Sequence, residues 1–151
     1  MPGQDYESPS APTPAPDTLA DLMPFAKTLG LVFDHASKDE VRAHVAWAPE
    51  LCTSGGVLHG GVLMSLADST GAACAFLNLP EGAGTTTIES KTNFLRGVRA
   101  GGGHHGEASV VVATSRPLHM GRKVIVVETD LRDDSQRLVA RVTQTQMVLG
   151  G

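Results

Sequence analysis

Apolar residues in the first third of the chain follow two different periods. Over residues 19–29 they recur every three or four positions and stop at Gly30, which predicts a short amphipathic helix with a glycine C-terminal cap. Residues 30–33 favour a strand, and over 41–47 apolar and polar residues alternate as in a half-buried strand. We therefore expect a helix followed by a β-hairpin that turns at residues 37–39.

A longer apolar segment, residues 60–77, predicts a helix that is apolar on nearly all sides. Beyond it the period returns to two in four segments rich in Val, Ile and Thr, which predict strands at 85–95, 106–114, 123–131 and 138–149. Turn residues separate these strands, at 101–103, at Pro117 with Gly121, and at 133–135. Because the connections are short and the helix needs cover all round, we expect an α+β domain. In it, a mainly antiparallel sheet of five or six strands wraps around a long central helix.

The composition fits one domain. The 151 residues are 41% hydrophobic and 19% charged, which suffices for one core over residues 18–151 but not for two. Residues 1–17 contain five of the nine prolines and few large apolar side chains. Such a segment cannot repay the entropy of ordering, so we expect it to form a disordered tail.

Charge, cysteines and histidines narrow the possible partners. A formal net charge of −4 argues against nucleic acid, whose binding draws on a basic surface. No apolar run reaches the roughly 18 residues of a membrane span, and no export signal is recognisable. Cys52 and Cys74 are too few for a disulfide framework, and His104, His105 and His119 lack metal-ligand spacing. We expect a cytoplasmic protein with reduced thiols, no metal, and no nucleic-acid or membrane partner.

Asp68 lies in the middle of the apolar helix, between Leu66 and Phe76. Burying an ionised carboxylate is costly unless it is paired or hydrogen-bonded, so Asp68 is either a compensated structural group or a chemical one. Gly60 and Gly61 open the same helix and leave its first N–H groups unobstructed at the positive end of the helix dipole. These groups suit an oxyanion, although the two glycines could equally serve close packing against a sheet.

Short motifs carry a family resemblance. Leu-His-Gly-Gly at 58–61 is followed by Leu-Ala-Asp at 66–68, and weaker matches are Thr-Asn-Phe-Leu-Arg at 92–96, Gly-Arg at 121–122 and Leu-Val-Ala-Arg at 138–141. Over about residues 19–149 the sequence resembles the hotdog-fold thioesterases. The most similar branch is the phenylacetate-pathway-like one, which includes 4-hydroxybenzoyl-CoA thioesterase. The resemblance implies a hotdog fold.

The resemblance also implies an acyl-CoA thioesterase, which hydrolyses a small or medium acyl or aryl thioester to a free acid and coenzyme A. No cofactor is expected, since coenzyme A is part of the substrate. The resemblance gives Gly60 the role of oxyanion donor and Asp68 that of general base or nucleophile. His59 is expected to be positional rather than a base. Thr53 stands where relatives usually place Asn or Gln, so a substrate-orienting role and a plain turn role both stay open.

Coenzyme A is a long polyanion, so its nucleotide end needs cations and its pantetheine arm needs a groove. Thr86 and Thr87 fall near a position where some relatives hold the attacking water with a serine. The cations could instead be solvated surface charges. The candidate substrate-binding residues are Gly61, Thr87, Arg96, Arg99, Gly121, Arg122 and Lys123.

The spacing of Gly60 and Asp68 predicts an oligomer. Eight residues on one helix separate their backbones by about 12 Å, whereas an attacking water must lie within about 3 Å of both base and carbon. Asp68 therefore has to serve Gly60 of a second chain, and we expect a homodimer with shared active sites that could pair further into a tetramer. Two alternatives stay open. A hotdog enoyl-CoA hydratase or dehydratase would need a histidine on the helix, and a non-catalytic acyl-CoA or acyl-carrier binding module would need no carboxylate at position 68.

Overall fold

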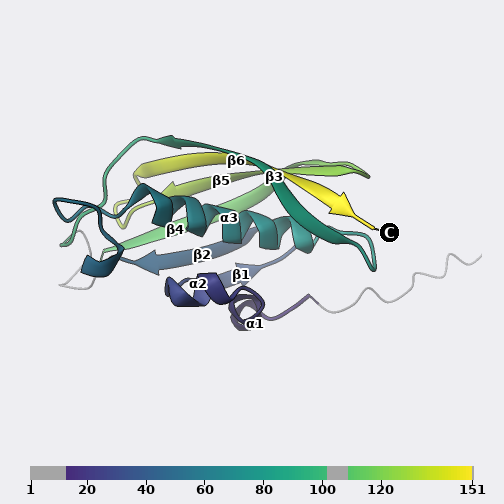
Figure 1. Ribbon diagram of the computed structural model, residues 1–151, viewed down its shortest axis with the longest axis horizontal. Helices are drawn as coiled ribbons and strands as arrows, with labels where there is room; N and C mark the ends of the chain where they lie inside the picture. Colours follow the sequence, from purple (N-terminus) through teal and green to yellow (C-terminus); the bar gives the residue numbers. More distant parts are fainter. Residues whose placement is uncertain (1–12, 102–108, 151) are drawn as a thin grey trace, which may run out of the picture.

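Six strands and one long helix dominate this computed structural model, which describes residues 13–101 and 109–150 (Figure 1). The strands are β1 (Val32–Ala36), β2 (Val41–Ala46), β3 (Gly84–Phe94), β4 (Val110–Met120), β5 (Val124–Arg132) and β6 (Leu138–Leu149). The helices are α1 (Pro16–Asp21), α2 (Pro24–Thr28), the short 3-10 helix η1 (Pro49–Leu51) and the long α3 (Gly60–Phe76). The strand order is β1-β2-β4-β5-β6-β3, and every neighbouring pair is antiparallel. The expected α+β hotdog architecture is confirmed.

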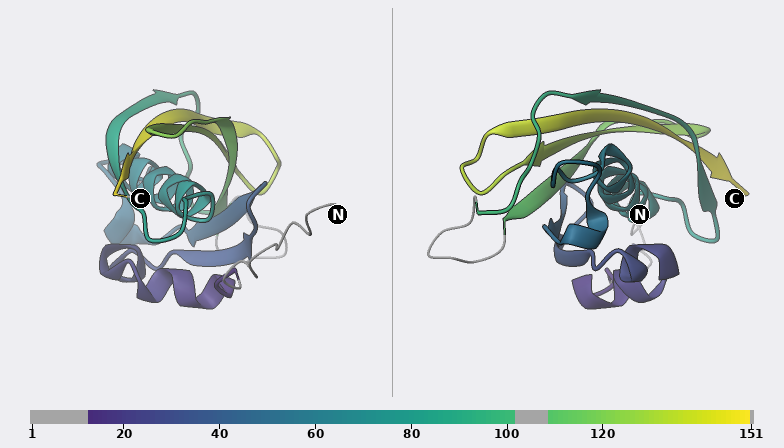
Figure 2. Two further views of the ribbon diagram at one scale, coloured as in Figure 1. Left: turned by 90° about the vertical axis from the view of Figure 1, so that its right-hand side faces the viewer. Right: turned by 60° about the vertical axis from the view of Figure 1, so that its left-hand side comes forward.

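The sheet curves around α3, and the core lies between them (Figure 2). On β5 every second side chain is buried, including Ile125, Val127 and Leu131, because successive residues of a strand face opposite sides of the sheet. On α3 the fully buried residues include Leu66 and Ala67. The small side chain of Ala67 leaves room for the strands that pack on the helix. No helix among the described residues is both long and apolar enough to cross a membrane.

The sheet does not cover α3 on all sides, which corrects the expectation that its whole girth is buried. Met64 and Phe76 are 41% and 44% exposed, Asp68 is exposed, and Ala72 is partly exposed. These residues recur every four positions and so form one stripe along the helix. We call Met64, Asp68, Ala72 and Phe76 the open stripe of α3. Apolar side chains on such a stripe leave a face that a second molecule could cover.

A β-bulge at Ile88 sets which side chains of β3 face the helix. Thr87 pairs with Gln146 and Glu89 with Thr145, so Ile88 is the extra residue of β3. Strict alternation would put Thr87 and Phe94, seven residues apart, on opposite faces. Because the bulge shifts the phase by one residue, Thr87 reaches Asp68 and Phe94 packs on Gly60, both on the helix side of the sheet.

The predicted N-terminal helix over 19–29 is wrong in its extent, because the structure has two short helices instead. Pro24 cannot donate an N–H to an ongoing helix, so α1 ends before it and α2 begins with it at the first helical position. The helix α1 starts at Pro16, inside the range expected to be a tail, while residues 1–12 lie outside the described residues.

Two strands also differ from the prediction in where they begin and end. The strand expected at 30–33 is β1 at 32–36, since the Leu31 N–H still bonds to Ala26 O at the end of α2. The strand expected at 106–114 is described only from Val110 and runs on to Met120. Pro117 lies within β4 next to a bulge, and bulges are among the few places where a sheet accepts proline. Of the turn predicted at Pro117 and Gly121, only the Gly121 part lies between strands, where β4 ends and β5 begins.

Candidate active site

His59 caps the N-terminus of α3. Its Nδ1 accepts a hydrogen bond from the Gly61 N–H at 2.8 Å, and its carbonyl accepts from the Val62 N–H. A ring nitrogen that accepts carries no proton, so the ring of the exposed His59 has its N–H at Nε2. A Cβ on Gly61 would lie 3.0 Å from His59 Nδ1, so a glycine there leaves room for the cap. The positional role of His59 stays a prediction, and the Gly61 N–H is already engaged by the cap.

The Gly60 N–H is the remaining donor at this helix end, and it has no hydrogen-bond partner among the described residues. A Cβ on Gly60 would lie 3.2 Å from the Phe94 ring, so the aromatic side chain packs directly on the glycine. An unpartnered N–H at a helix N-terminus attracts a negative oxygen. The oxyanion role expected for Gly60 stays a prediction, for which this N–H is available.

A groove of about 330 Å³ opens over this helix end. Its size and mostly apolar walls match those of small-molecule sites. One wall is held by the backbone, because the N–H groups of Leu95 and Arg96 both donate to Val139 O, at 2.8 and 3.1 Å. The lining residues are Val57, Leu58, Gly60, Leu63, Phe94, Leu95, Arg96 and Gly97.

Asp68 lies on the open stripe of α3, where its carboxylate is exposed in the single chain. The Thr87 hydroxyl donates to Asp68 Oδ1 at 3.0 Å, and the Gln144 Nε2 also donates to Oδ1. Asp68 Oδ2 has no hydrogen-bond partner among the described residues. The position of Asp68 among apolar residues predicts a buried carboxylate, whereas the structure shows one that is anchored on one oxygen and open on the other.

The two halves of this chemistry lie at different places along the sheet. Thr87, beside Asp68, and Phe94, beside Gly60, are seven residues apart on β3. Gly60 and Asp68 are themselves about 12 Å apart along α3. One chain therefore carries an oxyanion half-site and a carboxylate half-site, and the structure does not bring them together within the chain.

Thr53 lies in the loop that precedes α3. Its backbone N–H donates to Val57 O at 2.8 Å, and two left-handed glycines, Gly55 and Gly56, make the turn between them. The Arg99 guanidinium donates to Gly55 O, so part of its hydrogen-bonding capacity pins this loop. The Thr53 side chain is exposed and has no hydrogen-bond partner in the described part of the chain.

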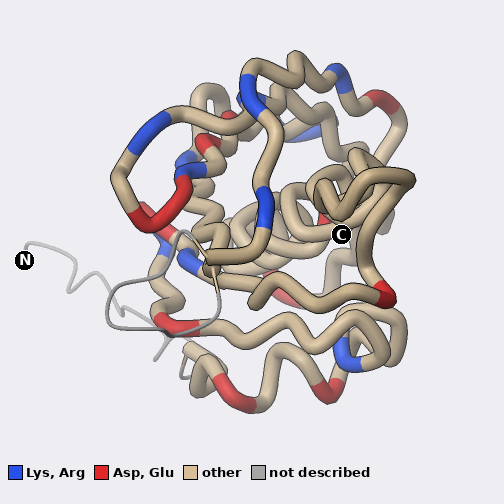
Figure 3. Tube along the Cα trace, turned by 90° about the vertical axis from the view of Figure 1, so that its left-hand side faces the viewer, with Lys and Arg blue, Asp and Glu red and all other residues tan. Residues whose placement is uncertain are grey.

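The other predicted cations lie in two separate places. Arg96 lines the groove at Gly60, whereas Gly121, Arg122 and Lys123 lie at the turn between β4 and β5. Val124 is aligned with Met147 of β6 and Phe94 with Ala140, so about 23 Å of strand separates the two places. Basic and acidic segments are interspersed around the end of the molecule where α3 begins (Figure 3).

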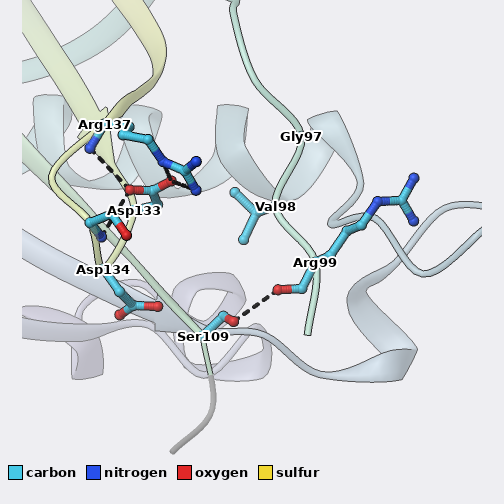
Figure 4. Close-up of a pocket in the computed structure, with 8 residues that line it drawn as sticks. Gly97, Val98, Arg99, Ser109, Asp133, Asp134 and Arg137 are labelled. Atoms are coloured by element: carbon cyan, nitrogen blue, oxygen red, sulfur yellow. Dashed lines mark hydrogen bonds and ion pairs between the residues drawn. The ribbon is translucent and has the colours of Figure 1, made fainter. Parts of the chain in front are cut away.

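A second, much smaller cavity of about 40 Å³ lies between the segment after β3 and the β5–β6 turn (Figure 4). Here Asp133 accepts hydrogen bonds from the Ser135 and Arg137 N–H groups and from the Arg137 side chain. Burial tends to raise the pKa of the Asp133 carboxyl, but these donors outweigh it and the pKa lies below its ordinary value. The polar groups satisfy one another, so this cavity serves the turn rather than a ligand.

Two residues of the site were missed from the sequence. Gln144 and Gln146 of β6 are both fully buried behind Asp68 and Thr87. The signal was present, because two glutamines alternate with Thr in a strand whose other inward positions are Val142 and Ala140. No group of three or more His, Cys, Asp or Glu side chains within residues 13–101 and 109–150 could hold a metal ion; His104 and His105 lie outside those residues.

Comparison with known proteins identifies the family. The sequence model described as the thioesterase superfamily matches residues 55–140. Rv1847 of Mycobacterium tuberculosis, whose name places it provisionally among the esterases, is 34% identical over 134 residues, which cover 85% of this chain and 90% of that protein. The structure of thioesterase HI1161 from Haemophilus influenzae matches with a TM-score of 0.82 at 27% identity, over 92% of this chain and 93% of that one.

The PaaI protein from the phenylacetic acid degradation operon of E. coli shares the fold, with a TM-score of 0.76 at 20% identity over 91% of this chain and 98% of that one. The fold, the helix-borne carboxylate and these matches define the class of protein, a hotdog-fold thioester hydrolase. The chain belongs to the thioesterase superfamily.

Proposed function

We propose that the protein is an acyl-CoA thioesterase, which hydrolyses a small or medium acyl or aryl thioester to a free acid and coenzyme A. One observation carries the proposal. The same helix presents an unpartnered Gly60 N–H over an apolar groove and, two turns further on, a carboxylate with one free oxygen. An oxyanion donor and a base that activates water are the two groups that thioester hydrolysis needs.

In this reaction the thioester carbonyl oxygen accepts the Gly60 N–H, and the exposed His59 Nε2–H is a second donor nearby. The hydrogen bonds from these two donors strengthen as negative charge develops on the oxygen. Each donor typically stabilises the transition state by about 3 kcal/mol. Asp68 Oδ2 takes a proton from water, whose oxygen attacks the carbonyl carbon. The tetrahedral intermediate collapses by breaking the carbon–sulfur bond. The sulfur takes the proton held by Asp68, so coenzyme A leaves as the free thiol, the acyl group leaves as the free acid, and the Asp68 carboxylate is regenerated. A direct attack by Asp68 on the carbonyl would use the same free oxygen.

The active site is shared between two chains, as the separation of the half-sites requires. Two features support a homodimer. The open stripe of α3 carries Met64 and Phe76 on either side of Asp68, and β3 is an edge strand with Ile88 51% exposed. An uncovered apolar stripe beside a long free edge is a liability for a lone molecule. Antiparallel packing of two α3 helices about a two-fold axis would place each Asp68 against the partner's Gly60 half-site.

The groove at Gly60 would hold the acyl end or the pantetheine arm, with Arg96 at its edge. Arg122 and Lys123 would then contact the nucleotide end of coenzyme A from the carboxylate half-site.

Both cysteines are free, and burial raises the pKa of the Cys74 thiol to about 11, so it is unreactive. Free thiols agree with a cytoplasmic location, which we include in the proposal.

The test is release of free thiol from acyl-CoA thioesters of C2 to C16 chain length and from aryl-CoA thioesters. We expect turnover of at least one class, abolished in Asp68→Asn, which is nearly isosteric but takes no proton. Asp39→Asn, an exposed aspartate on the β1–β2 turn, is the matched control and should keep full activity. Formation of a hydroxyacyl or enoyl product would instead indicate a hydratase. Binding without thiol release would indicate a carrier module.

A further inference from the structure

Two amide side chains lie behind the carboxylate, on the helix side of β6. Gln144 and Gln146 are fully buried, and both donate to the Thr87 hydroxyl, at 3.2 and 2.8 Å. Gln144 also donates to Asp68, and Thr85 donates to Gln146 Oε1 at 3.2 Å. The result is a continuous polar network that runs from two buried amides to the exposed side chains of Thr87 and Asp68.

The hydrogen-bonding capacity of the Thr87 hydroxyl is fully used. A hydroxyl has one donor and two acceptor positions. The donor goes to Asp68 Oδ1 at 3.0 Å, and the two acceptor positions take the Nε2 groups of Gln144 and Gln146. Thr87 therefore has no position left for a water molecule, and the water-holding role expected at this site does not fit its geometry.

The same count shows which oxygen of Asp68 can react. Oδ1 accepts from both Thr87 and Gln144, while Oδ2 has no partner in the described part of the chain. Two donors on one oxygen fix the rotation of a carboxylate about its terminal bond, which is otherwise a soft torsion. Oδ2 is thereby the oxygen left free, on a side chain that belongs to the exposed open stripe of α3.

The Gln144 amide oxygen is the part of the network that a structural role does not explain. Its Oε1 is buried without a hydrogen-bond partner in the described part of the chain, 2.2 Å from where a Cβ on Gly71 would stand. A buried unpaired oxygen is destabilising, and an apolar side chain of the same length would avoid this cost. What a glutamine provides at this position, and an apolar side chain would not, is the amide N–H groups that donate to Asp68 and Thr87.

We infer that Gln144 and Gln146 are positioning residues that hold Thr87 and Asp68 Oδ1, so that Asp68 offers Oδ2 alone to the attacking water. The inference rests on the proposed function, in which Asp68 activates water. Gln144 acts on Asp68 directly, and Gln146 acts only through Thr87. Loss of the Gln144 amide is therefore expected to lower kcat more than loss of the Gln146 amide.

The experiment measures kcat and KM for thioester hydrolysis, together with Tm, in four variants. Gln144→Met keeps length and volume but removes the donor, and it should lower kcat by about 10- to 100-fold with KM unchanged, because misplacing a reactive group acts on turnover. Its Tm should equal or exceed that of the wild type, because the unpaired Oε1 disappears. Gln146→Met should lower kcat less. Thr87→Val should resemble Gln144→Met, and Thr87→Ser, which restores the hydroxyl, should rescue most of the activity.

A double variant separates this inference from the proposed function. In an Asp68→Asn background, Gln144→Met should leave the residual rate unchanged, since a positioning residue has nothing left to position. If Asp68→Asn alone keeps wild-type activity, the role of Asp68 in the proposed function fails, and this inference fails with it. If Asp68→Asn is inactive while Gln144→Met and Thr87→Val keep wild-type kcat, the proposed function stands and this inference is overturned. A Gln144→Met variant that loses Tm and kcat together would also overturn it, since that result is typical of a structural residue.

Discussion

Gly71 shows how a residue remote from the substrate constrains the carboxylate. A Cβ at this position would lie 2.2 Å from Gln144 Oε1 and 3.1 Å from Val127 Cγ2. In an ordinary helix interior a change from glycine to alanine is favourable by about 1 kcal/mol. Here the added methyl group has to displace the buried Gln144 amide, and with it the donor on Asp68.

Gly71→Ala should therefore lower kcat by about 10-fold or more, with KM nearly unchanged, and should lower Tm despite the better helix propensity. Gly84→Ala is the matched control, because its Cβ would meet its nearest neighbour at 3.8 Å, an ordinary contact. Steady-state kinetics and thermal unfolding of both variants check the prediction. A fully active Gly71→Ala variant would mean that the position of the amide does not matter.

Asp133 gives a residue-scale prediction about pH. Its pKa is lowered in the folded protein because donors from Ser135 and Arg137 outweigh burial. A lowered pKa adds stability that is present above the unfolded value of about 3.9 and is lost as the pH falls through the folded value. Asp133→Asn should therefore lower the free energy of unfolding at pH 7 by about 1.5–3 kcal/mol, the usual range for hydrogen bonds to a charged group. Urea unfolding should show a smaller difference in the free energy of unfolding between the variant and the wild type at pH 3. A difference as large as at pH 7 would contradict this account.

At the scale of elements, the sequence correctly predicted the helix and the strands whose hydrophobic residues follow a clear period. The helix expected at 60–77 is α3, and the strands at 85–95, 123–131 and 138–149 match β3, β5 and β6 to within a residue or so. The errors have local causes. Pro24 divides the N-terminal helix, and the bulges near Ile88 and Pro117 involve no glycine that would mark them in the sequence.

The site was predictable where it depended on one element and not where it depended on several. Gly60 and Asp68 lie on one helix, so their separation followed from the helical rise. The contacts of Asp68 come from β3 and β6, which are 57 residues apart at Thr87 and Gln144. Alternation put Gln144 inside, but only the strand pairing and the bulge bring Thr87 to the same place.

The β4–β5 turn carries the next prediction. Arg122 is proposed to contact a phosphate of coenzyme A far from the reacting carbon, so its contribution is equal in the ground and transition states. Arg122→Ala should raise KM for acyl-CoA thioesters several-fold and leave kcat unchanged. A truncated acyl-pantetheine thioester, which lacks the nucleotide, should be hydrolysed equally by variant and wild type. Equal losses on both substrates would remove Arg122 from the phosphate site.

At the scale of the whole molecule, the unsatisfied features gather on one side. The open stripe of α3, the free edge of β3 and the unpartnered oxygen of Asp68 are all left uncovered by the chain's own sheet. Figure 1 shows α3 running along the sheet, so that its start and its middle hold different half-sites. A dimer that pairs two helices head to tail would cover the stripe and complete two sites together.

The central claim, a site shared between two chains, can be tested with mixed dimers. Asp68→Asn removes the carboxylate half-site, and Gly60→Pro removes the oxyanion N–H while its ring crowds Phe94 in the same half-site. Each homodimer should be nearly inactive. After both variants are refolded together, half of the dimers are mixed, and each mixed dimer holds one site with both lesions and one intact site.

The decisive measurement is the thioesterase activity of this mixture, after circular dichroism and sizing have shown that each variant folds and dimerises. A shared site predicts recovery to roughly a quarter of the wild-type activity, because half of the dimers then carry one working site out of two. If each site lay within one chain, every site in a mixed dimer would carry one lesion. A mixture as inactive as its two parents would therefore contradict the account.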